Sequence, residues 1–187
     1  VNAGMVMARA ITLFKIYSKN KFKPNEIHYE MNNDLQQTNP KGVYVTSIVG
    51  SYNSKTDVVE LSNAGHLPAL FKNGNGFHEY ESSSLPLGVK KADNSNVYKL
   101  ESFQLGSGRL YCFTDGFSEC RNEKGEEIGI DGVKQLITTF QNTSLKKELL
   151  KITRDVEKKS TKGQNFDGSN NQANILEDDL TIIGLGK

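Results

Sequence analysis

The spacing of apolar residues changes along the chain, and the order of these changes limits the folds open to it. Apolar residues recur every three or four positions over residues 3–17 and 24–37, which predicts two amphipathic helices. Over residues 43–113 they alternate with polar residues, which predicts strands. Helical spacing returns over 133–156, and a short apolar segment at 180–185 predicts a final strand. Helices, strands, helices and a strand in this order indicate an α+β fold with helices on antiparallel sheet.

Turn residues predict how the strands pair. Polar turns separate residues 43–49 from 58–61 and residues 68–71 from 77–80, and each pair is predicted to form a hairpin. The segments 97–103 and 109–113 flank a Gly-Ser-Gly turn and are predicted to form a third hairpin.

Length and composition exclude several classes of protein. The 187 residues are enough for one domain with a core, and we treat 1–187 as one domain. The net charge of +1 gives no electrostatic basis for binding nucleic acid or acidic lipid. No apolar run approaches the roughly 18 residues of a membrane span. The two cysteines have no metal-ligand spacing, and we expect a cytoplasmic protein.

Two acidic segments lie where strands are predicted to end or begin. Asp115 directly follows an apolar strand, and Glu119 lies one helical turn further along. Asp178 and Asp179 precede the last strand, in which neighbouring side chains point to opposite faces, so at most one of them is expected to face a site. Carboxylates from two strand ends suit Mg²⁺ or Mn²⁺ rather than zinc. The alternatives are that Asp115 caps a helix and that the second acidic pair lies in a solvated turn.

Histidines offer one further candidate. His66 ends a predicted strand in the segment Asn63-Ala-Gly-His66, where it could act as a ligand, a general acid or a donor to a ligand. A hydrogen-bonded structural histidine in a turn is the alternative. We expect His28 and His78 at the surface, on a polar helix face and in a hairpin.

Four segments together resemble a known family. They are Ser62-Asn-Ala-Gly-His-Leu-Pro-Ala-Leu70, Leu85-Pro-Leu-Gly88, Tyr111-Cys-Phe-Thr-Asp-Gly-Phe-Ser-Glu119 and Asp178-Asp-Leu-Thr-Ile-Ile183. They occur in the order found in SpoIIE/RsbU-like bacterial phosphatases, which are similar to the wider PPM (protein phosphatase 2C-like) serine/threonine phosphatases. The resemblance covers most of the chain, and four motifs in the correct order are specific.

The resemblance implies a fold and a metal centre. The fold would be an α-β-β-α sandwich, in which two packed antiparallel sheets are flanked by helix pairs. Asp115 and Asp178 match metal ligands of a centre with two Mn²⁺ or Mg²⁺ ions, and Glu119 matches a position that can hold a third ion. His66 falls near the site on a position of variable role and is our candidate catalytic residue.

The chain also departs from the family pattern. Its first-strand Gly-Asp-x-x-Asp motif and an Asp-x-x-Gly-His-Gly turn have no counterpart here. We therefore expect the first strands to be missing, a longer parent protein, and weak metal binding and catalysis by these 187 residues alone.

The implied activity is hydrolysis of phosphoserine or phosphothreonine in bacterial signalling. The expected partners are a phosphorylated STAS-type anti-sigma factor antagonist and an upstream sensor or receiver domain, with a homodimer as a further possibility. Three rival functions remain open: a non-catalytic phosphatase-like binding or regulatory module, an interaction domain that dimerises through its N-terminal helices, and a hydrolase of small phosphate compounds.

Overall fold

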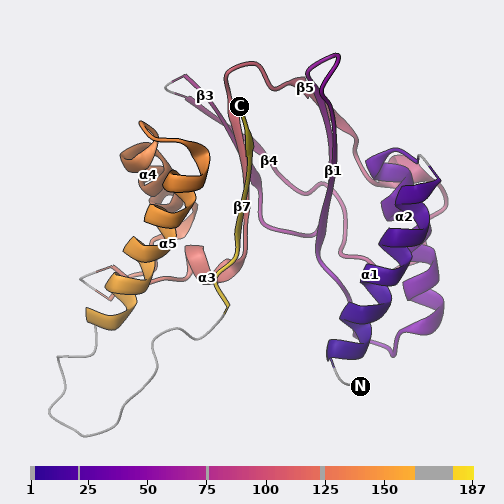
Figure 1. The fold of residues 1–187 in the computed structure, drawn as a ribbon. Helices are drawn as coiled ribbons and strands as arrows, with labels where there is room; N and C mark the ends of the chain where they lie inside the picture. Colours follow the sequence, from indigo (N-terminus) through magenta and orange to yellow (C-terminus); the bar gives the residue numbers. More distant parts are fainter. Residues whose placement is uncertain (1–2, 21, 75, 123–124, 163–178) are drawn as a thin grey trace, which may run out of the picture. The chain divides into compact units, whose positions relative to one another are not determined.

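A computed structural model describes residues 3–20, 22–74, 76–122, 125–162 and 179–187 (Figure 1). The chain divides into two compact units, which we describe separately. Unit 1 comprises Val1–Pro68 and Glu79–Gly106, and unit 2 comprises Ala69–His78 and Ser107–Lys187. Each unit contains an antiparallel sheet and a helix pair, which confirms the predicted α+β class.

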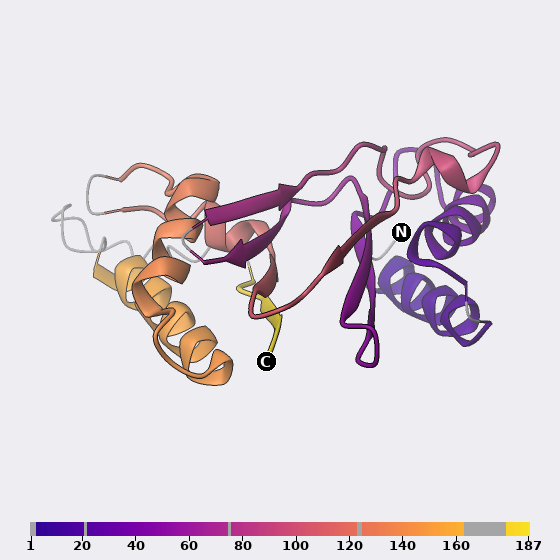
Figure 2. The ribbon, with the colours of Figure 1, turned by 90° about the horizontal axis from the view of Figure 1, so that it is seen from above.

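Unit 1 places two helices beside a three-stranded sheet of order β1-β2-β5. Figure 2 shows the two helices side by side. The elements are α1 (Ala3–Lys19), α2 (Pro24–Thr38), β1 (Ser47–Asn53), β2 (Val58–Ala64), the 3₁₀ turn η1 (Ser95–Val97) and β5 (Glu101–Gln104). The predicted apolar face of α2 is confirmed, because Ile27, Met31 and Leu35 are all buried. They form a core with Val49 of β1 and Ala64 of β2.

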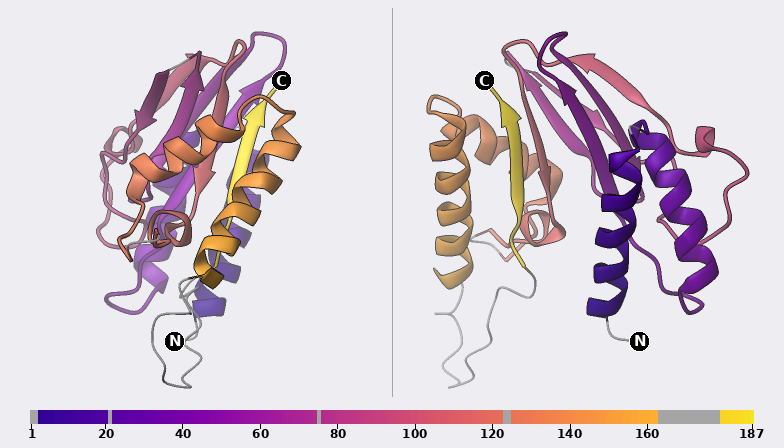
Figure 3. Two further views of the ribbon diagram at one scale, coloured as in Figure 1. Left: turned by 90° about the vertical axis from the view of Figure 1, so that its left-hand side faces the viewer. Right: turned by 45° about the vertical axis from the view of Figure 1, so that its right-hand side comes forward.

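Unit 2 contains the four-stranded sheet β4-β3-β6-β7, with β7 at one edge. Its elements are β3 (Ala69–Asn73), β4 (Gly76–Tyr80, whose last two residues are assigned to unit 1), β6 (Arg109–Phe113), α3 (Asp115–Ser118), α4 (Gly129–Phe140), α5 (Leu145–Lys162) and β7 (Ile182–Gly186). Ile152 and Val156 are the apolar residues of α5 that are completely buried. Figure 3 shows α5 alongside β7 in both of its views.

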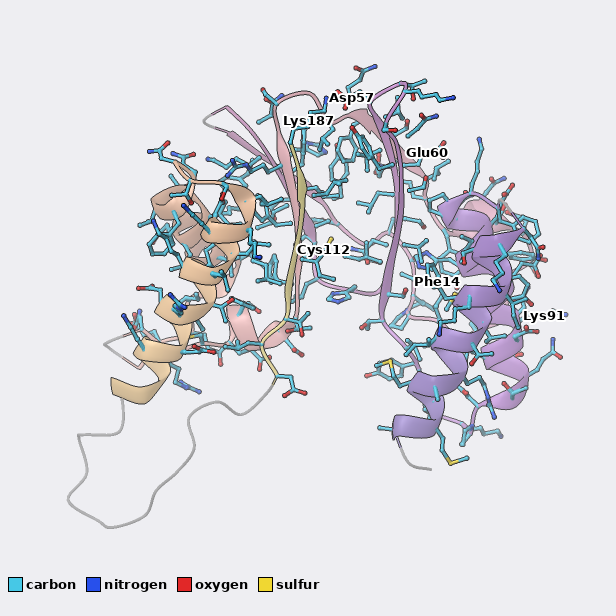
Figure 4. All side chains as sticks on the ribbon, viewed as in Figure 1. Phe14, Asp57, Glu60, Lys91, Cys112 and Lys187 are labelled. Carbon is cyan, nitrogen blue, oxygen red and sulfur yellow. The ribbon has the colours of Figure 1, made fainter. Side chains whose placement is uncertain are left out.

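The first two predicted hairpins are confirmed and the third is wrong. β1 pairs with β2, and β3 lies next to β4. β5 pairs with β2, whereas β6 lies between β3 and β7. Asp57, labelled at the β1–β2 turn in Figure 4, explains the difference. Its carbonyl accepts the N–H of Leu105 and its Oδ2 accepts the N–H of Gly106, both at 2.9 Å, so the end of β5 is held at this turn.

Two polar residues of α2, His28 and Asn32, are buried, which corrects the expectation that His28 lies at the surface. His28 is completely buried against the sheet, with its Nδ1 3.0 Å from Ser62 Oγ and its Nε2 3.3 Å from Ser47 Oγ. Asn32, also completely buried, accepts the N–H of Gly88 and donates to the carbonyl of Lys90. Hydrogen bonds therefore allow polar side chains to lie on the inner face of this helix.

Burial of His28 predicts a pH dependence of stability. Burial lowers the pKa of His28 from 6.5 to about 4. Between these values the unfolded chain binds a proton that the folded chain excludes, so stability falls as the pH drops from 6.5 towards 4. By pH 4 this group alone should cost about 3 kcal/mol. Urea unfolding of wild type and His28→Gln at pH 7 and pH 4 measures the difference, and equal losses in both proteins would contradict the assignment.

None of the helices in the described parts of the chain combines the length and hydropathy that a membrane span requires.

Candidate functional site

The end of β6 carries the strongest candidate, Asp115. Asp115 begins the single helical turn α3, and its side chain is exposed. Its carbonyl accepts the N–H of Glu119 at 2.8 Å, which closes the turn, and Phe117 is completely buried beneath it. Gly116 is also buried. Burial of Gly116 and Phe117 thus anchors the turn and leaves the carboxylate of Asp115 at the surface.

Asp115 does not occupy the helix-capping position that was the alternative to a metal site. The residue before the turn is Thr114, whose side chain makes no capping hydrogen bond. The Oδ1 atom of Asp115 accepts the N–H of the next residue, Gly116, at 3.1 Å. A carboxylate held by one backbone donor keeps most of its lone pairs available for a cation or a donor.

Thr114 connects the end of β6 to the segment that enters β7. Its hydroxyl donates to the carbonyl of Asp179 at 2.8 Å and accepts the N–H of Thr181 at 3.0 Å. Its own N–H donates to the carbonyl of Thr181, also at 3.0 Å. Asp115 is the next residue after Thr114, and Asp179 is exposed. Two acidic segments that are 64 positions apart in the sequence therefore meet at one end of this sheet.

Glu119 and Asp178, the other predicted metal ligands, are not brought next to Asp115 by the described residues. Glu119 is exposed and follows α3 at the opposite end of the turn from Asp115. Asp178 lies outside the described residues, so its role as a ligand stays a prediction. Within the described ranges, no cluster of three or more acidic, histidine or cysteine side chains has the geometry of a metal site. The donors present at this end of the sheet are oxygen atoms, which fit Mg²⁺ or Mn²⁺.

His66 lies in unit 1, in a loop that is fixed by Asn63. The Oδ1 atom of Asn63 accepts the N–H of His66 at 2.9 Å, and its amide donates to the carbonyls of Leu67 and Tyr80. Gly65 has a φ of 69°, and a side chain there would collide with Pro86. The Asn-Ala-Gly-His segment is thus a turn fixed by hydrogen bonds, in which His66 is half-buried.

Unit 2 contains a buried polar cluster that was not predicted from the sequence. Glu148 of α5 is completely buried, accepts the hydroxyl of Tyr111 at 2.6 Å and forms an ion pair with Arg109. Burial and the hydrogen bond to Glu148 raise the pKa of Tyr111. Arg109 also donates to the carbonyls of Gln141 and Thr143, which lie between α4 and α5. The Lys-rich composition of α5 does not indicate that Glu148 faces inward. Its spacing does, because Glu148 lies four residues before Ile152 and eight before Val156 and so shares their buried helical face.

The fold of these units is that of PP2C-type phosphatase domains. The chain superimposes on the SiaA-PP2C domain of Pseudomonas aeruginosa with a TM-score of 0.77, at 13% identity, over 98% of this chain and 68% of that one. A structure of the PP2C phosphatase domain of SpoIIE from Bacillus subtilis, with a fragment of its regulatory domain, gives a TM-score of 0.69 at 17% identity, over 94% of this chain and 47% of that one.

Sequence comparison identifies the family. The signature of the family Stage II sporulation protein E (SpoIIE) matches residues 1–186, and the chain belongs to this family. The phosphoserine phosphatase RsbU of Bacillus subtilis is 27% identical over 105 residues, which are 54% of this chain and 30% of RsbU. The match thus spans less than a third of the length of that relative.

Proposed function

We propose that the chain provides the catalytic core of a metal-dependent phosphoserine/phosphothreonine protein phosphatase in bacterial signalling. One observation carries the proposal: Thr114 ties the segment that bears Asp179 to the strand end that bears Asp115. Exposed carboxylates in this position suit divalent cations. Cations held there would in turn attract the negatively charged oxygens of a phosphorylated substrate. Membership of the SpoIIE family and the phosphatase names of the relatives support the same activity.

In this proposal the residues of the chain have distinct tasks. Asp115 and Asp178 hold Mn²⁺ or Mg²⁺, and Glu119 holds a third, more weakly bound cation. Bound cations would lower the pKa of a water molecule and neutralise the oxygens of the phosphoryl group. Thr114 fixes the approach of the two acidic segments through its hydroxyl. His66 is the candidate for donating a proton to the leaving oxygen. A catalytic centre like that of the family would need further carboxylates besides those of Asp115, Asp178 and Glu119.

Metal-dependent hydrolysis tests the proposal directly. The purified chain is incubated with a phosphoserine-containing STAS-type protein in the presence of Mn²⁺, Mg²⁺ or EDTA, and released phosphate is measured. We expect slow release that requires the metal, and no release from a phosphotyrosine peptide of matched charge. Stable binding of the phosphoprotein without any metal-dependent release would instead favour the non-catalytic module.

The proposal extends to partners and location. We place the activity in the cytoplasm, on an anti-sigma factor antagonist, under the control of a sensor or receiver domain in a longer parent protein. α1 exposes the apolar side chains of Met7, Ile11 and Phe14 on one helical face, which supports contact with a second copy or with such a domain. Light scattering at several concentrations tests the homodimer, and a constant monomer mass would contradict it.

A further inference from the structure

A polar hollow lies at the start of α2 in unit 1. Its volume is about 450 Å³. Its walls are formed by Lys23 and the first turn of α2, by η1, and by residues 98–100, which lead from η1 into β5. All of the lining residues lie outside the strands, so the walls of the hollow do not depend on how the sheet of unit 1 continues.

Asn25 places an unsatisfied acceptor in the wall of this hollow. The residue is 8% exposed, and its Nδ2 donates to the carbonyl of Ser95 at 3.4 Å. This bond fixes the orientation of the amide, because a carbonyl can only accept. The Oδ1 atom is buried and has no hydrogen-bond partner among the residues that the structure describes. A buried acceptor without a donor is costly, which favours a bound molecule that supplies one.

Tyr98 supplies a second buried polar group to the lining. Its side chain is 3% exposed, and the centroid of its ring lies 5.5 Å from that of His28. Burial raises the pKa of Tyr98 to about 12, and no hydrogen bond from a side chain contributes to this shift. Within the described ranges the hydroxyl has no partner. It is therefore available to donate to an oxygen of a ligand or to accept from one.

The start of α2 adds donors that suit an anion. Pro24 is the first residue of the helix, and the N–H of Ile27 donates to the carbonyl of Lys23 at 2.9 Å. The N–H groups of Asn25 and Glu26 precede this bond and therefore lack an acceptor within the helix. Such groups, together with the helix dipole, favour a negative charge at this end of a helix.

The charged side chains of the lining also favour an anion. They are Lys23, Glu26 and Lys99, which together carry a net charge of +1. Glu26 accepts the N–H of Lys23 through its Oε2 at 2.7 Å, and Lys99 forms an ion pair with Glu101 at 2.5 Å. The ammonium of Lys23 has no ion pair within the part of the chain that the structure describes. Lys23 is thus the cation available to a ligand.

We propose that this hollow binds a small organic anion that also carries hydroxyl groups. One hydroxyl of the ligand donates to Oδ1 of Asn25, and another pairs with the hydroxyl of Tyr98. The anionic group, a carboxylate or a phosphate, lies against the N–H groups at the start of α2 and the ammonium of Lys23. The site is separate from Asp115 and does not depend on the proposed phosphatase activity.

Four small probes test the class of ligand on the full chain. Glycerol 3-phosphate and glycerate carry an anionic group and hydroxyls, ethyl phosphate lacks the hydroxyls, and glycerol lacks the anionic group. Titration calorimetry measures the affinity, and the NMR shifts of backbone amides locate the binding. We expect one or both hydroxylated anions to shift the amides of Asn25, Glu26 and Asn96 and to bind at least about tenfold more tightly than ethyl phosphate or glycerol.

The preferred probe identifies the anionic group as a phosphate or a carboxylate. Ethyl phosphate binding as tightly as glycerol 3-phosphate and glycerate would show that the hydroxyls take no part, and it would overturn the proposal. If neither hydroxylated anion shifts these amides at about 10 mM, the hollow holds water only and the proposal is wrong.

A tyrosine variant separates binding from folding. Tyr98→Phe keeps the ring beside His28 and removes a hydroxyl that has no partner in the described residues, so the melting temperature should not fall. Its affinity for the preferred probe should fall about fivefold to tenfold. Tyr44→Phe removes an exposed hydroxyl outside the hollow and should leave the affinity unchanged.

A lysine variant tests the position of the anionic group. Lys23→Gln should weaken binding of the preferred probe about tenfold, whereas Lys91→Gln, at an exposed lysine of the same unit outside the hollow, should change it less than about twofold. Unchanged affinity in both Tyr98→Phe and Lys23→Gln would refute the site.

Discussion

Replacing Asp115 by asparagine should reduce metal-dependent phosphate release by at least about 100-fold, because the amide lacks the negative charge that holds a hard cation. The exchange preserves the size of the side chain and its acceptor for the N–H of Gly116. The turn closed by the hydrogen bond from Glu119 to Asp115 uses the backbone and should persist. Phosphate release and Mn²⁺ affinity, measured on the same preparation, should both fall while the circular dichroism spectrum and melting temperature stay close to wild type.

A matched control separates loss of a ligand from loss of charge. Asp131 is an exposed carboxylate on α4 that forms an ion pair with Lys134, three residues along the same helix. Asp131→Asn removes the same charge from unit 2 and should leave turnover within about twofold, since surface pairs of this kind contribute little. Equal turnover in wild type and Asp115→Asn would remove Asp115 from the metal site and with it the proposed mechanism.

The apolar pattern of the sequence predicts the elements well, because each element buries a face of its own. Ile27, Met31 and Leu35 are spaced at one helical face and all three are buried. The strands β1 and β2 alternate and pair through a short turn, so their register follows from local spacing. Local information of this kind was sufficient for both helix pairs and for the first two hairpins.

Contacts between distant parts of the sequence were not predictable in the same way. The Gly-Ser-Gly turn after β5 resembles a hairpin turn, yet Asp57 binds the N–H of Gly106 across 49 positions and keeps β5 beside β2. His28 looks like a surface residue because its neighbours on α2 are polar. Its burial depends on the hydroxyls of Ser47 and Ser62, which reach it from the sheet.

In the candidate site too, local features were predictable from the sequence and long-range contacts were not. The sequence motif around Asp115 was recognisable, and the structure places it at a strand end as expected. The role of Thr114 was not recognised, since its hydroxyl acts on residues 65 and 67 positions away. The local sequence around a Thr-Asp pair does not show whether the threonine hydroxyl bonds a neighbouring strand segment or lies in an ordinary turn.

Breaking the ion pair between Arg109 and Glu148 should strongly destabilise unit 2. Glu148 is completely buried, and its two described partners are Arg109 and Tyr111. Arg109→Met leaves a buried carboxylate that keeps only the tyrosine hydroxyl, which should cost about 3–5 kcal/mol in the free energy of unfolding. The loss also frees the carbonyls of Gln141 and Thr143, so the turn between α4 and α5 should exchange its amide hydrogens faster.

The double variant distinguishes the cost of an unpaired charge from the intrinsic value of the pair. Replacing Glu148 by leucine in the Arg109→Met background removes the buried charge, and stability should recover by at least about 2 kcal/mol relative to Arg109→Met. In the single Glu148→Leu variant, Tyr111 loses the acceptor that raises its pKa and keeps Arg109, which lowers it, so its phenol should titrate at lower pH than in wild type. Urea unfolding of the four proteins and absorbance titration of tyrosine measure both effects. A double variant no more stable than Arg109→Met would show that packing around the arginine stem, and not the charge of Glu148, determines the stability of this cluster.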